Sequence, residues 1–218
     1  MTTTVSVVIA AHPGRCANGM LNEATTSVWA QTRPPDAVHV ALDHEGLGAP
    51  PTRQRALTYA TTDWVAFLDS DDLFMPRHLE LLLAHADKTG ADFVYSWFRI
   101  LQQTGNGHMR EIPFDPATGD GVFPPGHYLN DFDPNDPIET TITVLVRTEL
   151  AKAVGFKAMN RGEINTGEDR YFTLGCLNAG AKISHLKRIT WLWRHHWLLN
   201  GGKGNTSGHP NQGDARIS

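Results

Sequence analysis

The sequence Val-Ser-Val-Val-Ile-Ala-Ala at residues 5–11 is almost wholly apolar and rich in β-branched side chains. A run of this kind, without polar alternation, is typical of a strand that is covered on both faces in a parallel sheet. The polar residues His12 to Arg15 follow it and predict a turn. A helix over 20–31 and a strand over 37–42 come next, so the chain is predicted to open as a β-α-β unit.

The same alternation continues to residue 98. A proline pair at 50–51 precedes the next segment, and proline is favoured in the first turn of a helix. The predicted elements are a helix over 52–60, a buried strand over 64–68, a helix over 76–88 and a strand over 91–98. Strands that alternate with helices over short connections indicate an open α/β sheet with right-handed crossovers.

The second half of the chain is less regular. Residues 101–136 are rich in Gly, Pro, Asn and Asp, which predicts loops and short strands. Order is predicted to return as a strand over 139–147, helices over 148–154 and 168–178 that end at Gly155 and Gly180, and strands over 182–186 and 188–194. Residues 200–218 are poor in apolar side chains, and we expect them to be a flexible tail unless a ligand orders them.

Composition excludes several classes of protein. With 218 residues, 40% of them hydrophobic, the chain is long enough to build one domain with its own core. A formal charge of -4 argues against a nucleic-acid binder that relies on a general basic face. No apolar run approaches the roughly 18 residues of a membrane span, and no secretory signal opens the chain, so we expect a cytoplasmic protein. Cys16 and Cys176 lie too far apart in sequence to suggest a disulfide framework or a zinc site.

Three carboxylates follow directly on the third buried strand, in the sequence FLDSDD at residues 67–72. Ligands of open parallel sheets bind outside the carboxyl ends of the strands, so these side chains are placed to meet a ligand. Residues two apart in an extended segment point to the same side, which predicts that Asp69 and Asp71 face one ligand together. Mg²⁺ or Mn²⁺ on a diphosphate suits such oxygen ligands.

An acidic turn is the alternative interpretation, in which Ser70 or Asp72 caps the helix that begins near Pro76. The chain has neither a Gly-x-Gly-x-x-Gly sequence after its first strand nor a Gly-Lys-Ser/Thr loop. A nucleotide would therefore have to be held through carboxylates and a metal. We interpret the sequence Gly-Gly-Lys-Gly at 201–204 as a flexible loop rather than a phosphate cradle.

Two further places carry candidate residues. Glu168 and Asp169 open a predicted helix, where a carboxylate either stabilises the helix start or acts as a general base at the edge of a cleft. The last strand ends in WLWRHHW, residues 191–197, with alternation placing Arg194 and His196 on one face. Arginine can neutralise phosphate and a neutral imidazole can bind a metal, while a packed or surface histidine is the alternative.

Taken together, these pieces resemble the family 2 glycosyltransferases, which have the GT-A fold. The resemblance runs from Val5 to about His196. It rests on the opening strand, the FLDSDD sequence, a Gly-Glu-Asp element at 167–169 and the late Arg/His pair, with further similarity at residues 27–32, Asp43, Arg53, 143–147 and 154–156. The resemblance implies an α/β, Rossmann-like, open mixed sheet flanked by helices in one domain. Residues 1–199 would form it, with a nucleotide-sugar half to about 100, an acceptor half from 101, and the tail 200–218 as a lid.

The same resemblance implies an inverting, metal-dependent transfer of a sugar from a nucleoside diphosphate donor, with a UDP-sugar favoured, to the hydroxyl of an unknown acceptor (a glycan, lipid-linked sugar or protein). Asp169 would be the base, with Glu168 as the second choice. The metal, Mn²⁺ or Mg²⁺, would be held by Asp71, Asp69 and His196. The implied donor-binding residues are Ala10, Ala11, His12, Asp43, Arg53, Asp69, Ser70 and Arg194.

Two other classes of protein remain open on the sequence. A nucleotidyltransferase acting on a sugar phosphate uses a similar sheet and metal carboxylates, but it releases pyrophosphate from a nucleoside triphosphate. A non-catalytic nucleotide or sugar-binding module keeps the fold without the chemistry. No nucleic-acid partner and no transmembrane segment are expected for any of the three.

Overall fold

A computed structural model of the chain describes residues 3–103, 108–112, 114–115, 120–121, 142–156 and 168–195. The strands are β1 (Val5–Ala11), β2 (Ala37–Leu42), β3 (Trp64–Asp69), β4 (Leu73–Phe74), β5 (Phe93–Gln103), β6 (Met109–Ile112), β7 (Phe114–Asp115), β8 (Asp120–Gly121), β9 (Val144–Arg147) and β10 (Ile183–His195). The helices are α1 (Pro13–Ala17), α2 (Met20–Trp29), α3 (Ala49–Leu57), α4 (His78–Thr89), α5 (Thr148–Val154) and α6 (Glu168–Asn178).

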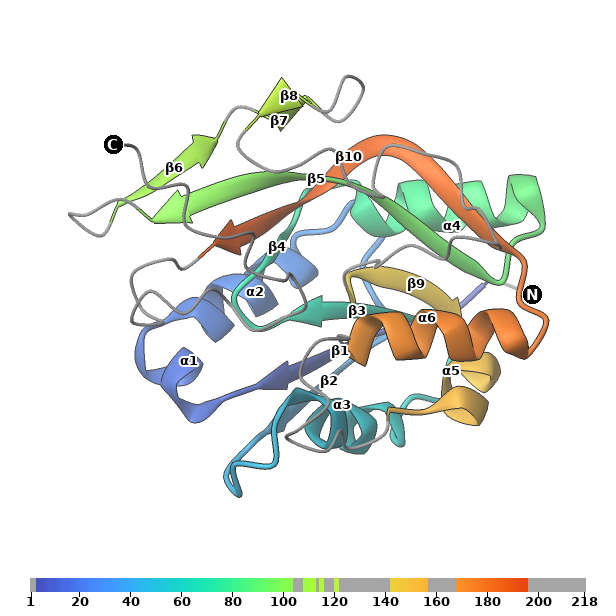
Figure 1. Cartoon of the computed structure of the whole chain (residues 1–218), viewed down its shortest axis with the longest axis horizontal. Coiled ribbons are helices and arrows are strands. Elements are labelled where there is room, and N and C mark those ends of the chain that lie inside the picture. The colour runs from blue at the N-terminus through green and yellow to red at the C-terminus, as the bar shows by residue number, and fades with distance from the viewer. Residues whose placement is uncertain are drawn as a thin grey trace, which may run out of the picture.

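The main sheet is open and mixed, with the strand order β2-β1-β3-β9-β5-β10-β4. Strands β2, β1 and β3 are parallel, β9 runs antiparallel to both of its neighbours, and β10 is parallel to β5. The strands β1, β3, β5 and β10 therefore end at the same edge of the sheet (Figure 1). Strand β6 pairs with the second half of β5, and β7 and β8 form a separate two-stranded sheet.

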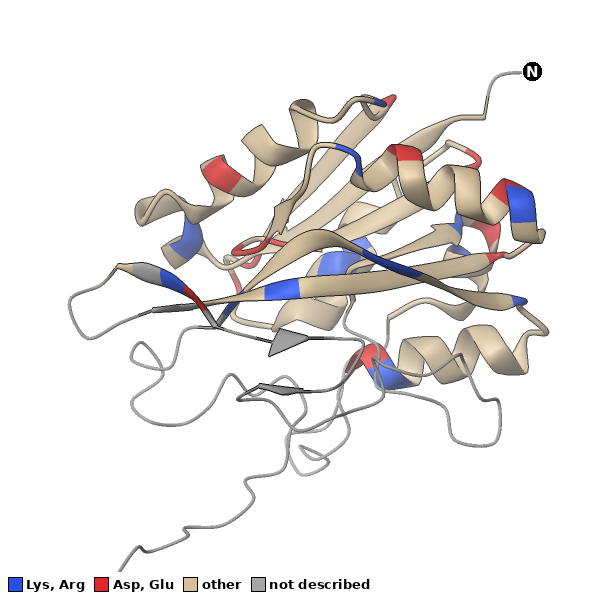
Figure 2. Ribbon diagram, turned by 90° about the horizontal axis from the view of Figure 1, so that it is seen from above, with Lys and Arg blue, Asp and Glu red and all other residues tan. Residues whose placement is uncertain are grey.

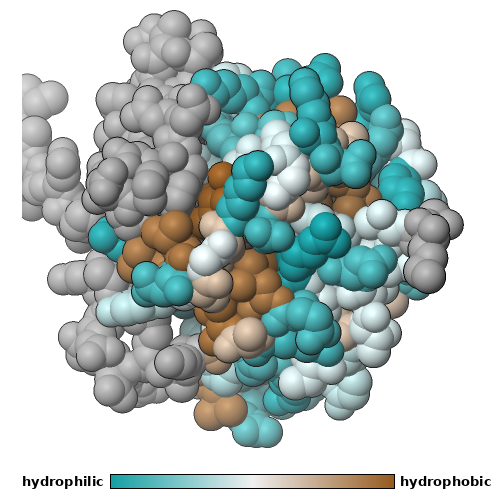
Figure 3. Space-filling view, turned by 90° about the vertical axis from the view of Figure 1, so that its right-hand side faces the viewer, coloured by the Kyte–Doolittle hydropathy of each residue, from teal (hydrophilic) through white to brown (hydrophobic). Residues whose placement is uncertain are grey.

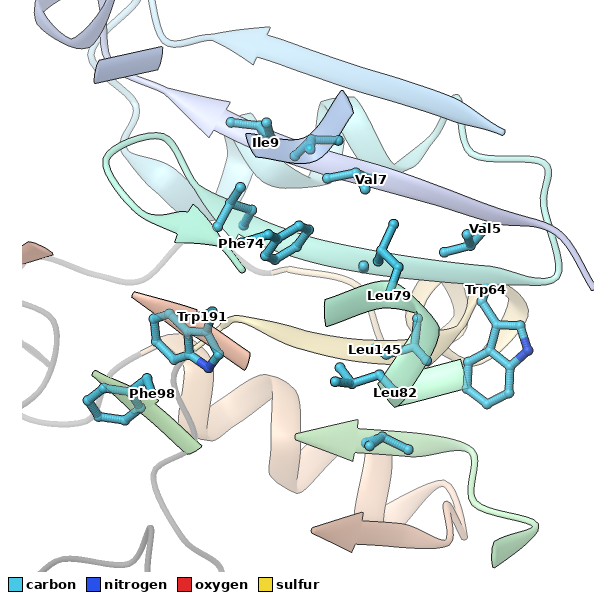
Figure 4. Packing of buried hydrophobic residues seen from close by; sticks show 14 of the residues in the cluster. Val5, Val7, Ile9, Trp64, Phe74, Leu79, Leu82, Phe98, Leu145 and Trp191 are labelled. Atoms are coloured by element: carbon cyan, nitrogen blue, oxygen red, sulfur yellow. The ribbon is translucent and has the colours of Figure 1, made fainter. Parts of the chain in front are cut away.

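One face of the sheet packs against α2 and α4. The alternating residues Val5, Val7 and Ile9 of β1 are fully buried on this face. Figure 4 shows these side chains with Leu79 and Leu82 of α4 in the same cluster. Complete burial of an aliphatic side chain stabilises the fold by about 1.5–3 kcal/mol. This core fixes β1, and with it the end of β1 that leads into the site.

The opposite face packs against α3, α5 and α6. Here the alternate residues of the same strands, such as Val8, Val65 and Phe67, are buried. Phe67 meets Phe172 of α6 edge-on, with ring centroids 5.6 Å apart. Because β1 and β3 are apolar on both faces, their side chains build two cores, as expected for strands inside a parallel sheet.

Most predicted elements are present close to the predicted bounds. Strand β2 and helices α5 and α6 have the predicted bounds, and a glycine with φ of 65° follows α5 at position 155. The predicted strand over 139–147 is described from 144 onward, and residues 139–141 lie outside the described residues. The α/β fold class predicted from the sequence is confirmed by this architecture.

Two predictions of local structure are wrong. Residues 13–17 form the short helix α1 rather than a plain turn, because Pro13 fits the first turn and the His12 imidazole caps it, accepting a hydrogen bond from the Gly14 N–H at 3.0 Å. The two strands predicted over 182–194 are one strand, β10. Its register against β5 shifts between Leu186 and Ile189 and again before Trp191, so the polar residues between them are taken up as a bulge without ending the strand.

The described surface is mixed in character. Figure 2 shows acidic and basic residues distributed over both layers, in line with the small net charge. Figure 3 shows a strip of hydrophobic side chains bordered by polar ones on the face at the right of Figure 1. Within the described ranges, no helix is long and apolar enough to cross a membrane. Cys16 is exposed, whereas Cys176 is buried and burial raises the pKa of its thiol to about 12.

Candidate functional site

The candidate site lies where β1 and β3 end. Ala10 is the register partner of Asp69 on one side and of Ala41 on the other, and both Ala10 and Ala11 are buried. This is the edge at which open α/β sheets bind their ligands. The backbone of β1 therefore ends directly beside the first carboxylate of the FLDSDD sequence.

Arg53 of α3 connects the end of β3 to the start of α6. Its side chain is only 2% exposed. One terminal nitrogen, Nη2, donates to Asp69 Oδ1 at 2.7 Å, and the other, Nη1, donates to Glu168 Oε1. Burial opposes the charge of the guanidinium, but the carboxylates of Glu168, Asp69 and Asp169 together raise the pKa of Arg53 above its ordinary value. Arg53 therefore remains a cation among these three carboxylates.

The chain turns immediately after β3. The Asp72 N–H donates to the Asp69 carbonyl at 3.1 Å, so residues 69–72 are a turn and not an extended segment. The prediction that Asp69 and Asp71 share one side because of strand alternation is therefore wrong in its geometry. Asp69 contacts Arg53, whereas Asp71 Oδ2 lies 2.7 Å from Arg15 Nη2 of α1. Each of the two carboxylates is held by a different arginine.

Asp72 points into the protein. It is buried, and its Oδ1 accepts a hydrogen bond from the Arg194 N–H of β10 at 2.8 Å. Burial, followed by the charges of Asp71 and Asp69, raises the pKa of Asp72 well above its usual range. Burial also raises the pKa of Asp69, reinforced by Asp71 and Glu168 and opposed by Arg53. Burial is thus the main reason that both carboxyl groups hold a proton more readily than a solvated carboxyl does.

The capping alternative for this turn is not observed. Helix α4 begins after Arg77, whose own side chain does not cap it, and the first-turn Leu79 N–H donates to Gln31 Oε1 at 3.1 Å. The His78 N–H instead donates to the Met75 carbonyl at 3.0 Å. Asp72 is engaged by β10 and Ser70 is buried, so neither residue serves α4. The acidic turn has no structural role at the helix start.

Arg194 joins the end of β10 to α2. Its guanidinium is 7% exposed and forms an ion pair with Glu23 of α2. Its backbone N–H holds Asp72, so one residue contacts both the acidic turn and the helix after α1. His196, the proposed partner of Arg194, lies outside the described residues.

Asp43 follows β2 at the same edge. Its backbone N–H donates to the Ala11 carbonyl, and its carboxylate accepts hydrogen bonds at 2.8 Å from the N–H groups of Leu47 and Gly48. Burial is the largest single influence and raises the pKa of Asp43, but the backbone hydrogen bonds together outweigh it, so the pKa is lowered overall. Asp43 is therefore an ionised side chain oriented by its own loop, next to the end of β1.

The described residues contain no group of three or more His, Cys, Asp or Glu side chains arranged to hold a metal ion. The oxygen atoms of Asp69 and Asp71 are the ligand type that Mg²⁺ and Mn²⁺ prefer. The donor chemistry therefore fits a divalent cation. A cation on Asp71 would share this carboxylate with Arg15, whose Nη2 lies 2.7 Å from Oδ2.

Sequence reasoning missed Arg15 and Glu23 as residues of this site. Arg15 comes four residues after the end of β1, at the edge where the acidic turn was expected, and that position is the signal that could have found it. Glu23 lies within a helix with no local signal, and only the tertiary packing of α2 against β10 reveals its role.

An open mixed sheet with an acidic turn at the carboxyl edge of its central parallel strands, facing a helix that begins with two carboxylates, defines the GT-A type of fold. The model of glycosyl transferase family 2 matches residues 25–155, and the chain belongs to this family.

The crystal structure of S. aureus TarS is similar in fold, with a TM-score of 0.63 and 19% identity over 88% of this chain and 37% of the TarS chain. The structure of TarS 1–349 in complex with UDP gives a TM-score of 0.63 and 20% identity, covering 88% of this chain and 60% of that one. The structure of TarS 1–349 in complex with UDP-GlcNAc gives a TM-score of 0.62 and 19% identity, covering 88% of this chain and 58% of that one. The chain thus spans less than two thirds of these TarS chains. No curated protein matches the sequence.

Proposed function

We propose that this protein transfers a sugar, with inversion at the anomeric carbon, from a nucleoside diphosphate donor to an acceptor hydroxyl. Its membership of glycosyl transferase family 2 supports the reaction class. The similarity in fold to TarS complexes with UDP and UDP-GlcNAc supports a UDP-sugar as the donor. The acceptor is a glycan, a lipid-linked sugar or a protein.

The contact of Arg53 with both Asp69 and Glu168 is the observation that carries the proposal. It brings the acidic turn after β3 and the first turn of α6 to one edge of the sheet, although residues 69 and 168 are 99 positions apart in the sequence. A transferase needs a donor site and a base within reach of one another, because the reaction joins two substrates.

Asp169 is the proposed base. It accepts the proton of the acceptor hydroxyl as the oxygen forms a bond to the anomeric carbon. The bond between that carbon and the diphosphate oxygen breaks on the opposite face, and the nucleoside diphosphate leaves with the electron pair. One displacement from the rear inverts the configuration. Glu168, already held by Arg53, is the weaker candidate for this role.

The donor is proposed to lie along the ends of β1, β2 and β3. Asp43, together with Ala10, Ala11 and His12, lines the part proposed for the base and ribose. Asp69 and Ser70 follow on β3 beside them. The remaining proposed contacts are Arg53 and, for the diphosphate, Arg194 and His196.

We propose a divalent cation, Mn²⁺ or Mg²⁺, held by Asp71 with Asp69 and His196. When bound, such an ion stabilises the negative charge that develops on the leaving diphosphate. The tail 200–218 is the proposed lid over the donor, and residues 101–136 are proposed to contribute to acceptor choice. A closed lid would keep water from acting as the acceptor.

A panel of nucleotide sugars, each tested with and without Mn²⁺ and read out by released nucleoside diphosphate, tests the function. The expected result is metal-dependent release from one donor, abolished by Asp71→Ala. Asp169→Asn is expected to leave nucleotide binding intact while stopping transfer, and Asp87→Asn on the exposed face of α4 is the matched control. Release of pyrophosphate from a nucleoside triphosphate would instead indicate a nucleotidyltransferase. Binding of UDP without turnover of any donor would indicate a binding module.

A further inference from the structure

We propose that Arg53 and Glu168 are a positioning pair, which fixes the first turn of α6 against the end of β3 and so sets the place of Asp169. The inference rests on the proposed function, because it gives Asp169 the role of base. It assigns Glu168 a different role, as a residue that acts through its neighbour and does not react.

The geometry of Arg53 suits this role. Its two terminal nitrogens bind carboxylates of two different elements, Asp69 at the end of β3 and Glu168 at the start of α6. The planar guanidinium holds its donors in a fixed fork, so binding one carboxylate fixes the direction of the other. Because the guanidinium is buried, losing either partner would leave a charge uncompensated in the interior.

Aromatic packing adds a second connection between the same parts. The guanidinium carbon of Arg53 lies 5.3 Å from the centre of the Phe156 ring. Phe156 is stacked on Phe172 of α6, with centroids 4.4 Å apart and planes inclined by 14°. Arg53 thus contacts α6 in two ways. It forms an ion pair with Glu168 at the first residue of the helix, and it packs on Phe156, which in turn stacks on Phe172 one turn further along. Two contacts at different points restrain both the position and the tilt of the helix.

The contact of Glu168 with Arg53 separates the roles of the two carboxylates. Consecutive residues of a helix point about 100° apart, since one turn takes 3.6 residues. When Glu168 is turned to Arg53, the Asp169 side chain leaves the helix at a different angle, although its charge still acts on Arg53. The Glu168 carboxylate is also committed to the buried guanidinium of Arg53, so it is not free to turn toward an acceptor. Asp169 is therefore the proposed base, and Glu168 fixes the first turn of α6 that carries it.

The test removes only the α6 side of the bridge. Glu168→Ala is expected to lower kcat for sugar transfer by about 10- to 100-fold, the range for a misplaced catalytic group, while the Kd for UDP changes less than threefold. Glu168→Asp keeps the charge but shortens the reach, and Glu168→Gln keeps the reach but loses the charge. Both are expected to give intermediate kcat values, and Glu168→Gln, which removes one charge partner of the buried guanidinium, is expected to lower the thermal unfolding temperature more than Glu168→Asp. Glu149→Ala in the first turn of α5, which is exposed, is the control and should change nothing.

Hydrogen exchange gives a readout that does not depend on activity. Amides in the first two turns of α6 should exchange faster in Glu168→Ala than in the wild type, and Glu149→Ala should leave them unchanged. The positioning role is overturned if Glu168→Ala keeps full kcat, if UDP affinity falls as much as kcat, or if exchange in α6 does not change. Absence of transfer by the wild-type protein from any nucleotide sugar would instead overturn the proposed function, while the exchange result would still decide whether the pair holds the helix.

Discussion

Arg15 Nη2 lies 2.7 Å from Asp71 Oδ2, joining the short helix after β1 to the turn after β3. Both side chains are largely shielded, with 21% and 13% of their surfaces exposed. Asp71 is the carboxylate that we propose for the divalent cation. The guanidinium and the cation therefore compete for the Asp71 carboxylate. A stronger ion pair with Arg15 means a lower affinity for the metal.

Arg15→Ala should raise the affinity for Mn²⁺ in the absence of donor. A partly exposed ion pair is worth up to about 1 kcal/mol, which corresponds to an increase of roughly threefold to fivefold. Titration of Mn²⁺ by calorimetry or by electron paramagnetic resonance measures the change. Arg188→Ala removes the same charge from an exposed position on β10 and is the control. Equal gains in the two variants would mean that only the net charge matters, and that Arg15 does not compete for Asp71.

Asp72→Asn should make the stability of the protein less sensitive to pH. The pKa of Asp72 is raised in the folded state, so its contribution is fully present below the unfolded pKa and is lost as pH rises through the folded pKa. Each unit of pKa difference corresponds to about 1.4 kcal/mol of unfolding free energy. The carboxamide oxygen of the variant can still accept the hydrogen bond from the Arg194 N–H. The variant should therefore be more stable than the wild type near pH 7.

Urea unfolding at a series of pH values from 4 to 8, in EDTA, measures this difference. Asp87→Asn, an exposed substitution of the same kind, provides the baseline. A gap between wild type and Asp72→Asn that stays constant over the whole series would show that Asp72 does not titrate in this range.

His78 should make the protein sensitive to acid. It is buried, its ring stacks on Phe74 at 3.9 Å, and its Nδ1 lies 2.7 Å from Thr190 Oγ1. Burial lowers the pKa of His78 to about 3. A histidine with a lowered pKa stabilises the fold above its unfolded value near 6.5, and this contribution is lost as pH falls toward the folded value.

The substitution His78→Asn should therefore flatten the pH dependence of unfolding free energy between pH 6.5 and 4 by about one bound proton, besides lowering stability overall through lost packing. Chemical unfolding at half-unit pH intervals gives the slope. His44→Asn, in the loop after β2, should leave the slope as in the wild type. An identical slope in His78→Asn would show that His78 does not account for the acid sensitivity.

The sequence was sufficient for the fold because the strands β1 and β3 are apolar on both faces. Only a parallel interior position suits such a strand, and the intervening helices then follow from their spacing. The wrong predictions of local structure fall where tertiary packing, and not the local sequence, decides whether an element continues. Strand β10 continues through polar residues because β5 supports it on one side over its whole length, and no local pattern reports such support.

The candidate site was predicted in composition but not in its contacts. The carboxylates at 69–72 and 168–169 were recognisable because they follow or open regular elements. Their arginine partners were not paired with them, since Arg15, Arg53 and Arg194 each come from a distant element. Such pairs depend on how the elements that carry the three arginines meet in space. The local pattern of a single sequence does not reveal that geometry.

Gly175 allows α6 to approach α5, and this contact supports the helix that carries Asp169. A Cβ atom added at Gly175 would lie 2.4 Å from Val154 Cγ1. Alanine ordinarily stabilises a helix interior by about 1 kcal/mol relative to glycine. Here the clash should outweigh that gain, because a valine in a helix has one strongly preferred rotamer and cannot turn away. Gly175→Ala is therefore expected to destabilise the protein by about 1–2 kcal/mol, as overpacking does.

The substitution Val154→Ala removes the clashing methyl groups and gives a matched rescue. In that background, Gly175→Ala should stabilise the protein by up to about 1 kcal/mol, because only the helix propensity remains. The sign of its effect should therefore reverse between the two backgrounds, which a double-mutant cycle of urea unfolding measures directly. The same sign in both would show that Val154 does not limit the approach of the helices. If the first turn of α6 sets the base, Gly175→Ala should also lower kcat more than it weakens UDP binding, and Val154→Ala should restore it.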